Sequence, residues 1–177
     1  MKSLKSIACS LAPGLAVAAL IGAPNHGAAE GLAALVDDFN NAEVNNMGIA
    51  RQFLNDTMVG GSTSMSPQVA DGILSVSGDI VPPRGQPGWA SSVLLLDPQG
   101  LPVDATAFDG VRLLIRVNKG MISVSANSTD VTNFDYHAAL VPAKPDGEFH
   151  EVRIPFESMK RAWSEQTSLD PGTIASL

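Results

Sequence analysis

Apolar and polar side chains alternate through residues 109–127, which is the period of a half-buried β-strand. One inward-facing set is Val111, Leu113, Ile115 and Val117, and a second is Ile122, Val124 and Ala126. Between the two sets, Asn118-Lys119-Gly120 supplies a turn with glycine available for a positive φ. Period, turn chemistry and β-branched content agree, so this stretch predicts a β-hairpin at the centre of an all-β domain.

Other short apolar runs have the same character. The pattern predicts strands over 35–39, 73–80, 89–96, 134–141 and 149–156, with loops at 40–46, 55–64, 82–88 and 97–100. Residues 47–54 fit a strand or a helical turn, and residues 157–163 fit a short helix. Many short strands with closely spaced turns predict a β-sandwich or a barrel.

The first 29 residues have the three parts of a secretory signal peptide. Lys2 and Lys5 precede an apolar run over 7–23, and Gly27-Ala28-Ala29 fits a small-residue cleavage site before Glu30. The run is broken by Pro13-Gly14 and is short for a bilayer span. We therefore expect export to the periplasm or the extracellular space, with no membrane insertion after cleavage, and a single domain over residues 30–177.

Cleavage also changes the charge and the thiol content of the chain. It removes Lys2 and Lys5, which takes the formal charge from −7 to −9, and it removes Cys9, the only cysteine. An acidic chain without a basic cluster argues against nucleic acid as a partner. The mature domain has no disulfide and no cysteine-based metal site.

Six short motifs, in order along residues 36–156, resemble the complex I intermediate-associated protein 30 family. They are Asp37-Asp38-Phe39, the loop 56–64 (Asp-Thr-Met-Val-Gly-Gly-Ser-Thr-Ser), the stretch 87–92 (Pro-Gly-Trp-Ala-Ser-Ser), Asp109-Gly110-Val111-Arg112-Leu113, Phe134-Asp135-Tyr136-His137-Ala138 and Val152-Arg153-Ile154-Pro155-Phe156. Their shared order makes the resemblance more specific than any one motif.

The resemblance implies a jelly-roll β-sandwich related to galactose-binding-like domains. It also implies two more strands after Ile174–Leu177, so we expect this chain to lack the last strands of that fold. Mitochondrial members of the family assist respiratory complex I assembly on the matrix side. An exported chain lies in a different compartment, so the resemblance implies an assembly-factor-like domain rather than that particular role.

The loop 56–64 is the first candidate binding site. Gly60-Gly61 permits tight backbone geometry, and Asp56 and Ser62 offer oxygens to sugar hydroxyls. The simpler interpretation is that the glycines shape the loop while Asp56 bonds the loop backbone. A phosphate loop is not expected, because no lysine follows the glycines.

Trp89, Tyr136 and Trp163 are the aromatic residues that a carbohydrate-binding platform would use, because flat rings stack on sugar faces. Trp89 and Tyr136 lie in predicted strands, where aromatic side chains are more often core residues. Trp163 lies in a polar tail, where exposure is expected.

No constellation of residues predicts an enzyme or a cofactor. Asp135 and His137 share one face of a predicted strand, but no activated nucleophile accompanies them, and ordinary surface polarity explains the pair. Asp37-Asp38 offers oxygens to Ca²⁺, although acids at the end of a strand need no metal. We predict no catalytic residue, no metal and no cofactor. The expected function is a non-catalytic binding domain for a protein partner, with a carbohydrate-binding module as the alternative.

Overall fold

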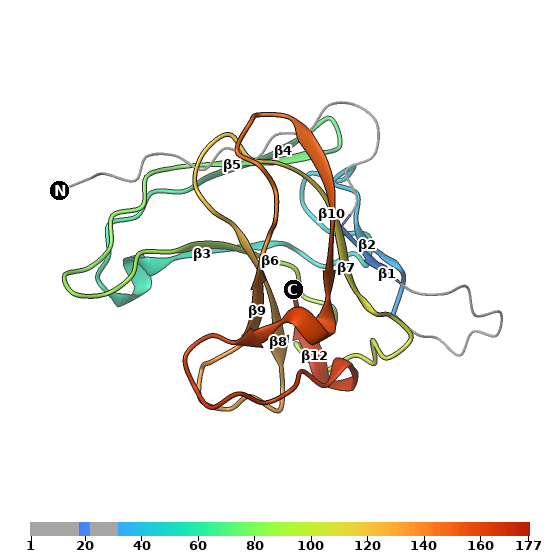
Figure 1. The fold of residues 1–177 in the computed structure, drawn as a ribbon. Coiled ribbons are helices and arrows are strands. Elements are labelled where there is room, and N and C mark those ends of the chain that lie inside the picture. The colour runs from blue at the N-terminus through green and yellow to red at the C-terminus, as the bar shows by residue number, and fades with distance from the viewer. Residues whose placement is uncertain (1–17, 22–31) are drawn as a thin grey trace.

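The computed structural model describes residues 18–21 and 32–177, and β-strands dominate it (Figure 1). Strands account for 38% of the structure and helical turns for 7%. The strands are β1 (Ala18–Ile21), β2 (Leu35–Asp37), β3 (Gln52–Asn55), β4 (Ser66–Ala70), β5 (Ile73–Ser77), β6 (Ala90–Val93), β7 (Gly110–Arg116), β8 (Ser123–Ser128), β9 (His137–Leu140), β10 (Phe149–Pro155), β11 (Lys160–Arg161) and β12 (Ile174–Ser176). The prediction of an all-β fold is confirmed at this level.

The strands pair into two four-stranded and two two-stranded sheets, all antiparallel. Their orders are β10-β7-β1-β2, β11-β9-β8-β12, β3-β6 and β4-β5. Short 3-10 helices lie at Asp56–Val59, Phe156–Ser158 and Pro171–Thr173. The expected helix over 157–163 is therefore wrong, because Lys160–Arg161 instead forms β11 and pairs with β9. Within the described part of the chain, no helix is long and apolar enough to cross a membrane.

The predicted hairpin over 109–127 contains two real strands that do not pair with each other. β7 pairs with β10 along its whole length, from Phe149 opposite Arg116 to Pro155 opposite Gly110. β8 pairs instead with β9 and β12. Among the connecting residues only Gly120 has a positive φ, at 92°, so the two consecutive positive values of a type I′ hairpin turn are absent from this connection. Six residues separate the strands, enough for the chain to cross from one sheet to another.

A true two-residue hairpin lies elsewhere, between β4 and β5. Asp71 and Gly72 both have positive φ, at 55° and 73°, and Ala70 lies opposite Ile73. Asp-Gly is a strong short-range hairpin signal, so this turn is predictable from the sequence.

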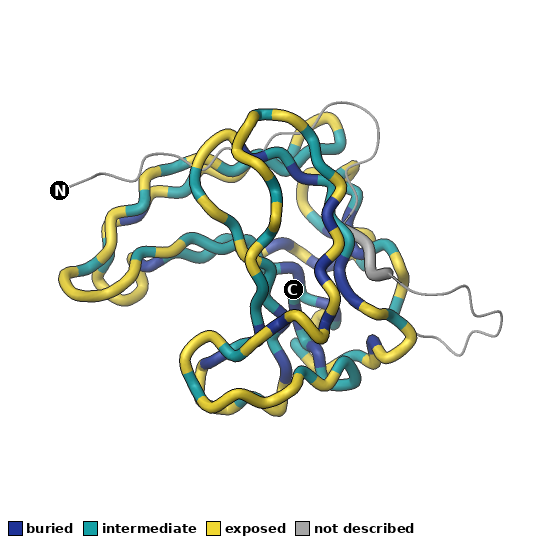
Figure 2. The backbone as a smooth tube through the Cα atoms, viewed as in Figure 1, coloured by how far each residue is buried: buried dark blue, intermediate teal, exposed yellow. Residues whose placement is uncertain are grey.

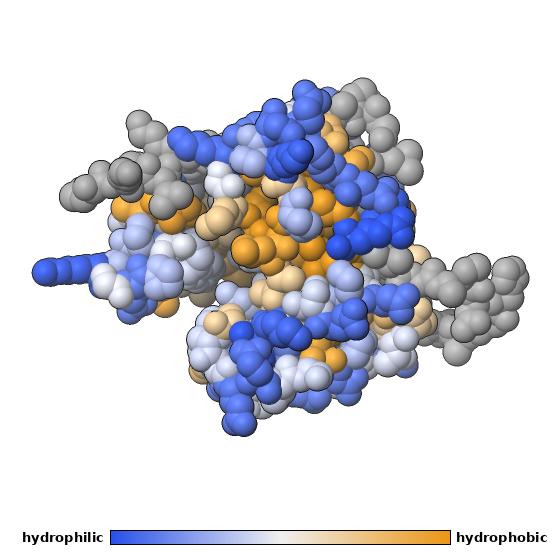
Figure 3. All heavy atoms as spheres, viewed as in Figure 1, coloured by the Kyte–Doolittle hydropathy of each residue, from blue (hydrophilic) through white to orange (hydrophobic). Residues whose placement is uncertain are grey.

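The core is formed by the inward-facing residues of several strands (Figure 2). Val36, Val111 and Ile174 are at most 1% exposed, and Val152 and Ile154 are buried on one face of β10 as the alternation predicts. Leu113 and Val124 are half-buried and pack against the same cluster. Apolar residues also gather in the middle of the face shown in Figure 3. A hollow is lined by Val117, Met121, Ile122 and Leu140 among others.

Of the predicted signal peptide, only β1 lies within the described residues. β1 pairs with β7 on one edge and with β2 on the other. The basic start and the predicted cleavage position lie outside the described residues.

Candidate functional site

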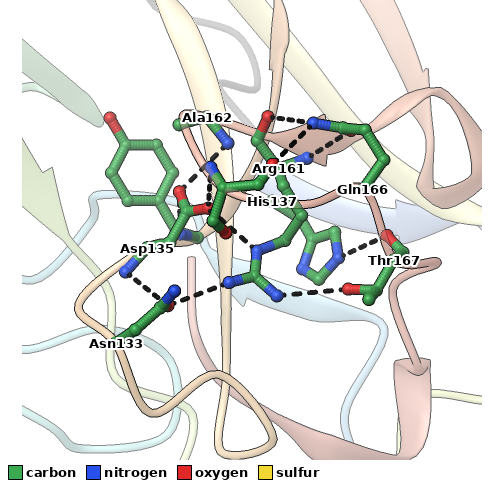
Figure 4. A network of polar contacts seen from close by, with 9 residues as sticks. Asn133, Asp135, His137, Arg161, Ala162, Gln166 and Thr167 are labelled. Atoms are coloured by element: carbon green, nitrogen blue, oxygen red, sulfur yellow. Dashed lines mark hydrogen bonds and ion pairs between the residues drawn. The ribbon is translucent and has the colours of Figure 1, made fainter.

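The candidate site is built on the loop that leads into β9 and on the segment that follows β11. Arg161 lies opposite His137 and Lys160 lies opposite Ala138 in the short ladder between these strands. This pairing brings residues 133–136 next to residues 161–167, nearly thirty positions later in the chain (Figure 4). The rest of the site follows from this contact.

Asp135 holds the two segments together. Its side chain is fully buried, and its carboxylate accepts hydrogen bonds from Arg161 Nε at 3.0 Å, from the backbone N–H groups of Ala162 and Ser164 at 3.0 Å, and from the Ser164 hydroxyl. It also accepts from the Tyr136 N–H at 2.8 Å. The strand end is thereby tied to the tail.

The hydrogen bonds decide the protonation of Asp135. Burial by itself raises the pKa of this carboxyl, because a charge is poorly solvated in the interior. Bonds from Ser164, from the Tyr136 N–H and from Arg161 favour the ionised form and together outweigh burial, so the pKa lies well below the usual 3.8. Asp135 is therefore a permanent anion at neutral pH. A group held in this way is a structural anchor, since a general base must be free to take a proton.

Arg161 extends the network on the other side (Figure 4). Its side chain is only 9% exposed. Besides Asp135, its guanidinium donates to Asn133 Oδ1 at 2.9 Å and to Thr167 Oγ1 at 3.1 Å. The Gln166 side chain bonds to both backbone groups of Arg161: its Oε1 accepts from the Arg161 N–H, and its Nε2 donates to the Arg161 carbonyl. The planar donor set of arginine suits this task, because it holds several acceptors in fixed directions.

His137 is also buried, at 2% exposed. Its Nε2 lies 2.9 Å from the carbonyl oxygen of Thr167, so Nε2 carries the proton that is donated. Its Nδ1 is buried without a hydrogen-bond partner among the described residues. The explanation of Asp135 and His137 as surface polarity is wrong, because the structure buries both residues and gives each its own partners.

Three aromatic residues are next in the chain to members of this network, and we call Phe134, Tyr136 and Trp163 the aromatic rim. Trp163 is 62% exposed, and its ring centroid lies 5.2 Å from that of Tyr136 with the two rings nearly perpendicular, at 86°. Phe134 is 95% exposed. Two of the predicted site residues, Tyr136 and Trp163, are thus in contact.

The predicted loop 56–64 forms a separate structure around Asp56. That side chain is fully buried and accepts from the Thr63 N–H at 3.1 Å, from the Thr63 hydroxyl at 2.7 Å and from the Trp89 N–H at 3.3 Å. Gly60 ends the 3-10 helix with a φ of 87°. Gly61 has no room for a side chain, because a Cβ there would lie 2.1 Å from Asp56 Oδ1. The carboxylate faces its own loop, as the simpler interpretation expects.

The remaining predicted residues lie around the same loop. Ser62 is exposed and donates its N–H to the Val81 carbonyl, and Trp89 is 38% exposed just before β6. The seven predicted site residues therefore fall into two groups: Asp56, Gly60, Gly61, Ser62 and Trp89 around one loop, and Tyr136 and Trp163 in the aromatic rim.

Phe134, Arg161 and Ser164 are not among the residues predicted for a site. The alternating pattern predicts a strand that begins at Phe134, but its φ of 61° places Phe134 in a loop before β9. The polar tail around Arg161 and Ser164 has no periodic pattern, so its contact with Asp135 has no signal in the sequence.

Asp37 and Asp38, the oxygen-rich pair, have different roles. Asp37 is fully buried and receives two hydrogen bonds from the Arg51 guanidinium, at 2.6 and 2.7 Å. Asp38 is half-buried, and hydrogen bonds from Asn40 lower its pKa. Among the residues that the structure describes, no group of three or more His, Cys, Asp and Glu side chains is placed to hold a metal ion.

Comparison with known proteins adds no relative to this description. No family model, no curated protein and no solved structure matches the chain.

Proposed function

We propose that this chain is a non-catalytic, exported binding domain whose partner is a protein, built as a jelly-roll β-sandwich of the complex I intermediate-associated protein 30 type. The export signal and the six ordered motifs support this proposal. Several residues of those motifs have structural roles: Asp37 and Asp56 are fully buried, Asp135 is a buried anchor, and Phe156 is a core residue. The motifs therefore bear on the fold, and the partner has to be argued from the surface.

The observation that carries the proposal is the aromatic rim. Large aromatic residues on a surface, next to groups held rigidly by a buried network, are typical of sites where a protein partner docks. Here Asp135 lies between Phe134 and Tyr136 in the chain, and its bonds to Ala162 and Ser164 fix the backbone on both sides of Trp163. Because this backbone is already fixed, little conformational entropy is lost when a partner binds, and this favours affinity.

Phe134 adds a second reason. Its φ of 61° lies in the left-handed region, which is unfavourable for a bulky side chain. Such strain is maintained where the surrounding structure imposes it, and it is concentrated at functional sites. A residue that is strained and almost fully exposed contributes little to the core, so we assign Phe134 a role at the surface.

A carbohydrate-binding module is the alternative function, and the contact between Tyr136 and Trp163 favours it. Aromatic rings bind sugars by stacking on their faces. The nearly perpendicular arrangement of these two rings offers one flat face rather than a shared platform. Such a surface suits an irregular protein better than a flat polysaccharide, so the protein partner remains the leading proposal.

The test compares matched tryptophan variants of the exported protein. Crosslinking in the source cells should recover a protein partner with the wild type and with Trp89→Ala, and much less of it with Trp163→Ala. A glycan array should show no saturable binding. Glycan binding that is lost in Trp163→Ala, with the circular dichroism spectrum unchanged, would replace the protein partner with the carbohydrate alternative.

The non-catalytic part of the proposal has its own test. Hydrolase and transferase activities should be absent from purified protein. An activity that co-purifies and disappears in a folded Asp135→Asn variant would overturn it.

A further inference from the structure

β1 occupies a position that joins two other strands. In the order β10-β7-β1-β2 it lies between β7 and β2, with Ala19, Leu20 and Ile21 opposite Arg112, Val111 and Gly110. On its other edge, Ala18 lies opposite Asp37 and Ala19 opposite Leu35. Apart from β1, no strand of the described chain pairs with β2. We call the space that β1 fills between β2 and β7 the strand slot.

The walls of the strand slot are held by contacts that do not involve β1. β7 is held away from β2 by its pairing with β10 at seven positions, and at Gly110 the two strands lie so close that a Cβ would clash with the Ile154 carbonyl oxygen. β2 is anchored by the buried ion pair between Asp37 and Arg51. Removing β1 therefore leaves a gap between two fixed strands.

The predicted signal cleavage would create this gap. β1 lies within residues 1–29, so cleavage before Glu30 separates it from the domain. The backbone groups of residues 35–37 and 110–112 that face β1 would lose their partners, and unpaired strand edges readily accept another strand. Val36 and Val111, which are 0% and 1% exposed with β1 in place, would also come closer to water.

We propose that the strand slot is an acceptor site, which takes an extended apolar segment of a protein partner once cleavage has removed β1. The occupant in the full chain defines the chemistry of the ligand: Ala18–Ile21 is four consecutive aliphatic residues, antiparallel to both neighbours. In this mode of recognition, main-chain hydrogen bonds supply affinity and pockets for alternate side chains supply specificity. The inference rests on the exported form in the proposed function, but uses a different surface from the aromatic rim.

The first experiment uses the full chain and a peptide with the sequence of residues 16–23. Proline at position 20 removes a ladder donor from a central strand. In Leu20→Pro, those amides of residues 110–112 that face β1 should lose protection from hydrogen exchange, while the amides of residues 123–128 keep it. The labelled peptide should bind to this variant and restore protection, and should bind neither the wild type nor the control Leu15→Pro. A folded Leu20→Pro variant that does not bind the peptide would overturn the proposal.

A second experiment does not depend on the proline variant folding. In a Cys9→Ser background, the pair Ala19→Cys and Arg112→Cys places thiols directly opposite each other, where a disulfide should form under mild oxidation. The pair Ala19→Cys and Arg116→Cys, four residues further along β7, should not form one. Absence of the first disulfide in folded protein would mean that β1 does not occupy the slot.

The exported protein completes the test. Its N-terminus, measured by mass spectrometry, should be Glu30, and this form should bind the peptide. A folded exported protein that begins at Glu30 without binding the peptide would contradict the proposal, as would one that retains residues 18–21. In either case, capture of a partner that depends on Trp163 would leave the proposed function standing. If the protein is not exported, the localisation given in the proposed function is wrong.

Discussion

Asp56 and Asp135 organise two loops by the same means, a fully buried carboxylate that accepts hydrogen bonds from its surroundings. Their partners differ. Asp56 is bonded by neutral groups only, from Thr63 and Trp89, and Gly61 and Gly88 make room for its carboxylate. Asp135 is bonded by neutral groups and by the Arg161 guanidinium.

This difference separates a loop that is closed on itself from one that supports a surface. Around Asp56, the bonds stay within the loop and its neighbour, and the space for a larger side chain at Gly61 is missing. Around Asp135, the same type of bond joins two distant segments and leaves Phe134 and Trp163 exposed. The bonds within the first loop account for Asp56 and Gly61 by structure alone. The bonds around Asp135 leave Phe134 and Trp163 exposed, so these two aromatic residues need another explanation.

The largest effect is expected from Asp135→Ala. It leaves the buried Arg161 guanidinium without its counter-ion, which costs about 3 to 5 kcal/mol of unfolding free energy. Urea unfolding measures this loss, and Asp130→Ala, an exposed acid in the same loop, is the control with a change near zero. Equal effects at the two positions would contradict the anchor role.

Asp56→Ala should cost less unfolding free energy, about 1 to 3 kcal/mol, because the hydrogen-bond donors that it leaves without an acceptor are neutral. The same unfolding experiment applies, with the exposed Asp79→Ala as the control. A loss as large as that of Asp135→Ala would remove the proposed distinction between the two loops.

The glycines of the first loop should differ in a predictable way. Gly61→Ala should cost about 1 to 3 kcal/mol, because the new Cβ displaces the Asp56 carboxylate. Gly60→Ala has open space and costs about 1 kcal/mol through its positive φ alone. The penalty at Gly61 should shrink in an Asp56→Ala background, whereas the penalty at Gly60 should not. A double-mutant cycle measures this, and equal penalties in both backgrounds would contradict it.

Acid should reduce the stability that the loop around Asp135 contributes to the fold. The pKa of Asp135 is lower in the folded chain than in the unfolded one, so the folded state binds the proton less readily. Its contribution to stability is complete above about pH 4 and declines as the pH falls below the unfolded value of 3.8. Thermal unfolding from pH 6 to pH 2.5 should show a smaller decline in Asp135→Asn. An unchanged decline would assign the acid sensitivity to other carboxylates.

The smallest effect on stability is expected at the aromatic rim, and its sign is opposite. Phe134→Gly should stabilise the fold by about 1 kcal/mol or less, because glycine accepts a φ of 61° without strain. The same variant should weaken capture of the protein partner. A destabilised Phe134→Gly variant would mean that the ring packs in the domain rather than serving the surface.

Alternation along the chain predicted most of the strands correctly, because burial on one face repeats every second residue whatever the partner strand is. Val152 and Ile154 of β10 and Val111 and Ile115 of β7 are buried as expected. Pairing was harder to predict. Residues 109–127 were expected to form a hairpin, but β7 and β8 belong to different sheets. The Asp71-Gly72 turn shows that the correct local signal existed elsewhere and was overlooked.

In the candidate site, too, contacts between residues close in sequence could be predicted, and contacts between distant residues could not. Asp56, Gly60 and Gly61 are close in sequence, so their loop could be found and its structural interpretation weighed. The contact of Asp135 with Arg161 and Ser164 joins residues 26 and 29 positions apart, with β9 and β10 between them. No local rule specifies such a contact.

By itself, the sequence determined the β-rich class, the inward-facing residues of the main strands and the loop around Asp56, since each depends on residues within a few positions of one another. The tertiary structure alone decided which strands pair, how Asp135 joins the two segments that carry the aromatic rim, and that β1 fills the strand slot. Those features depend on which distant segments meet, and that is set by the packing of the whole chain rather than by any short stretch of it.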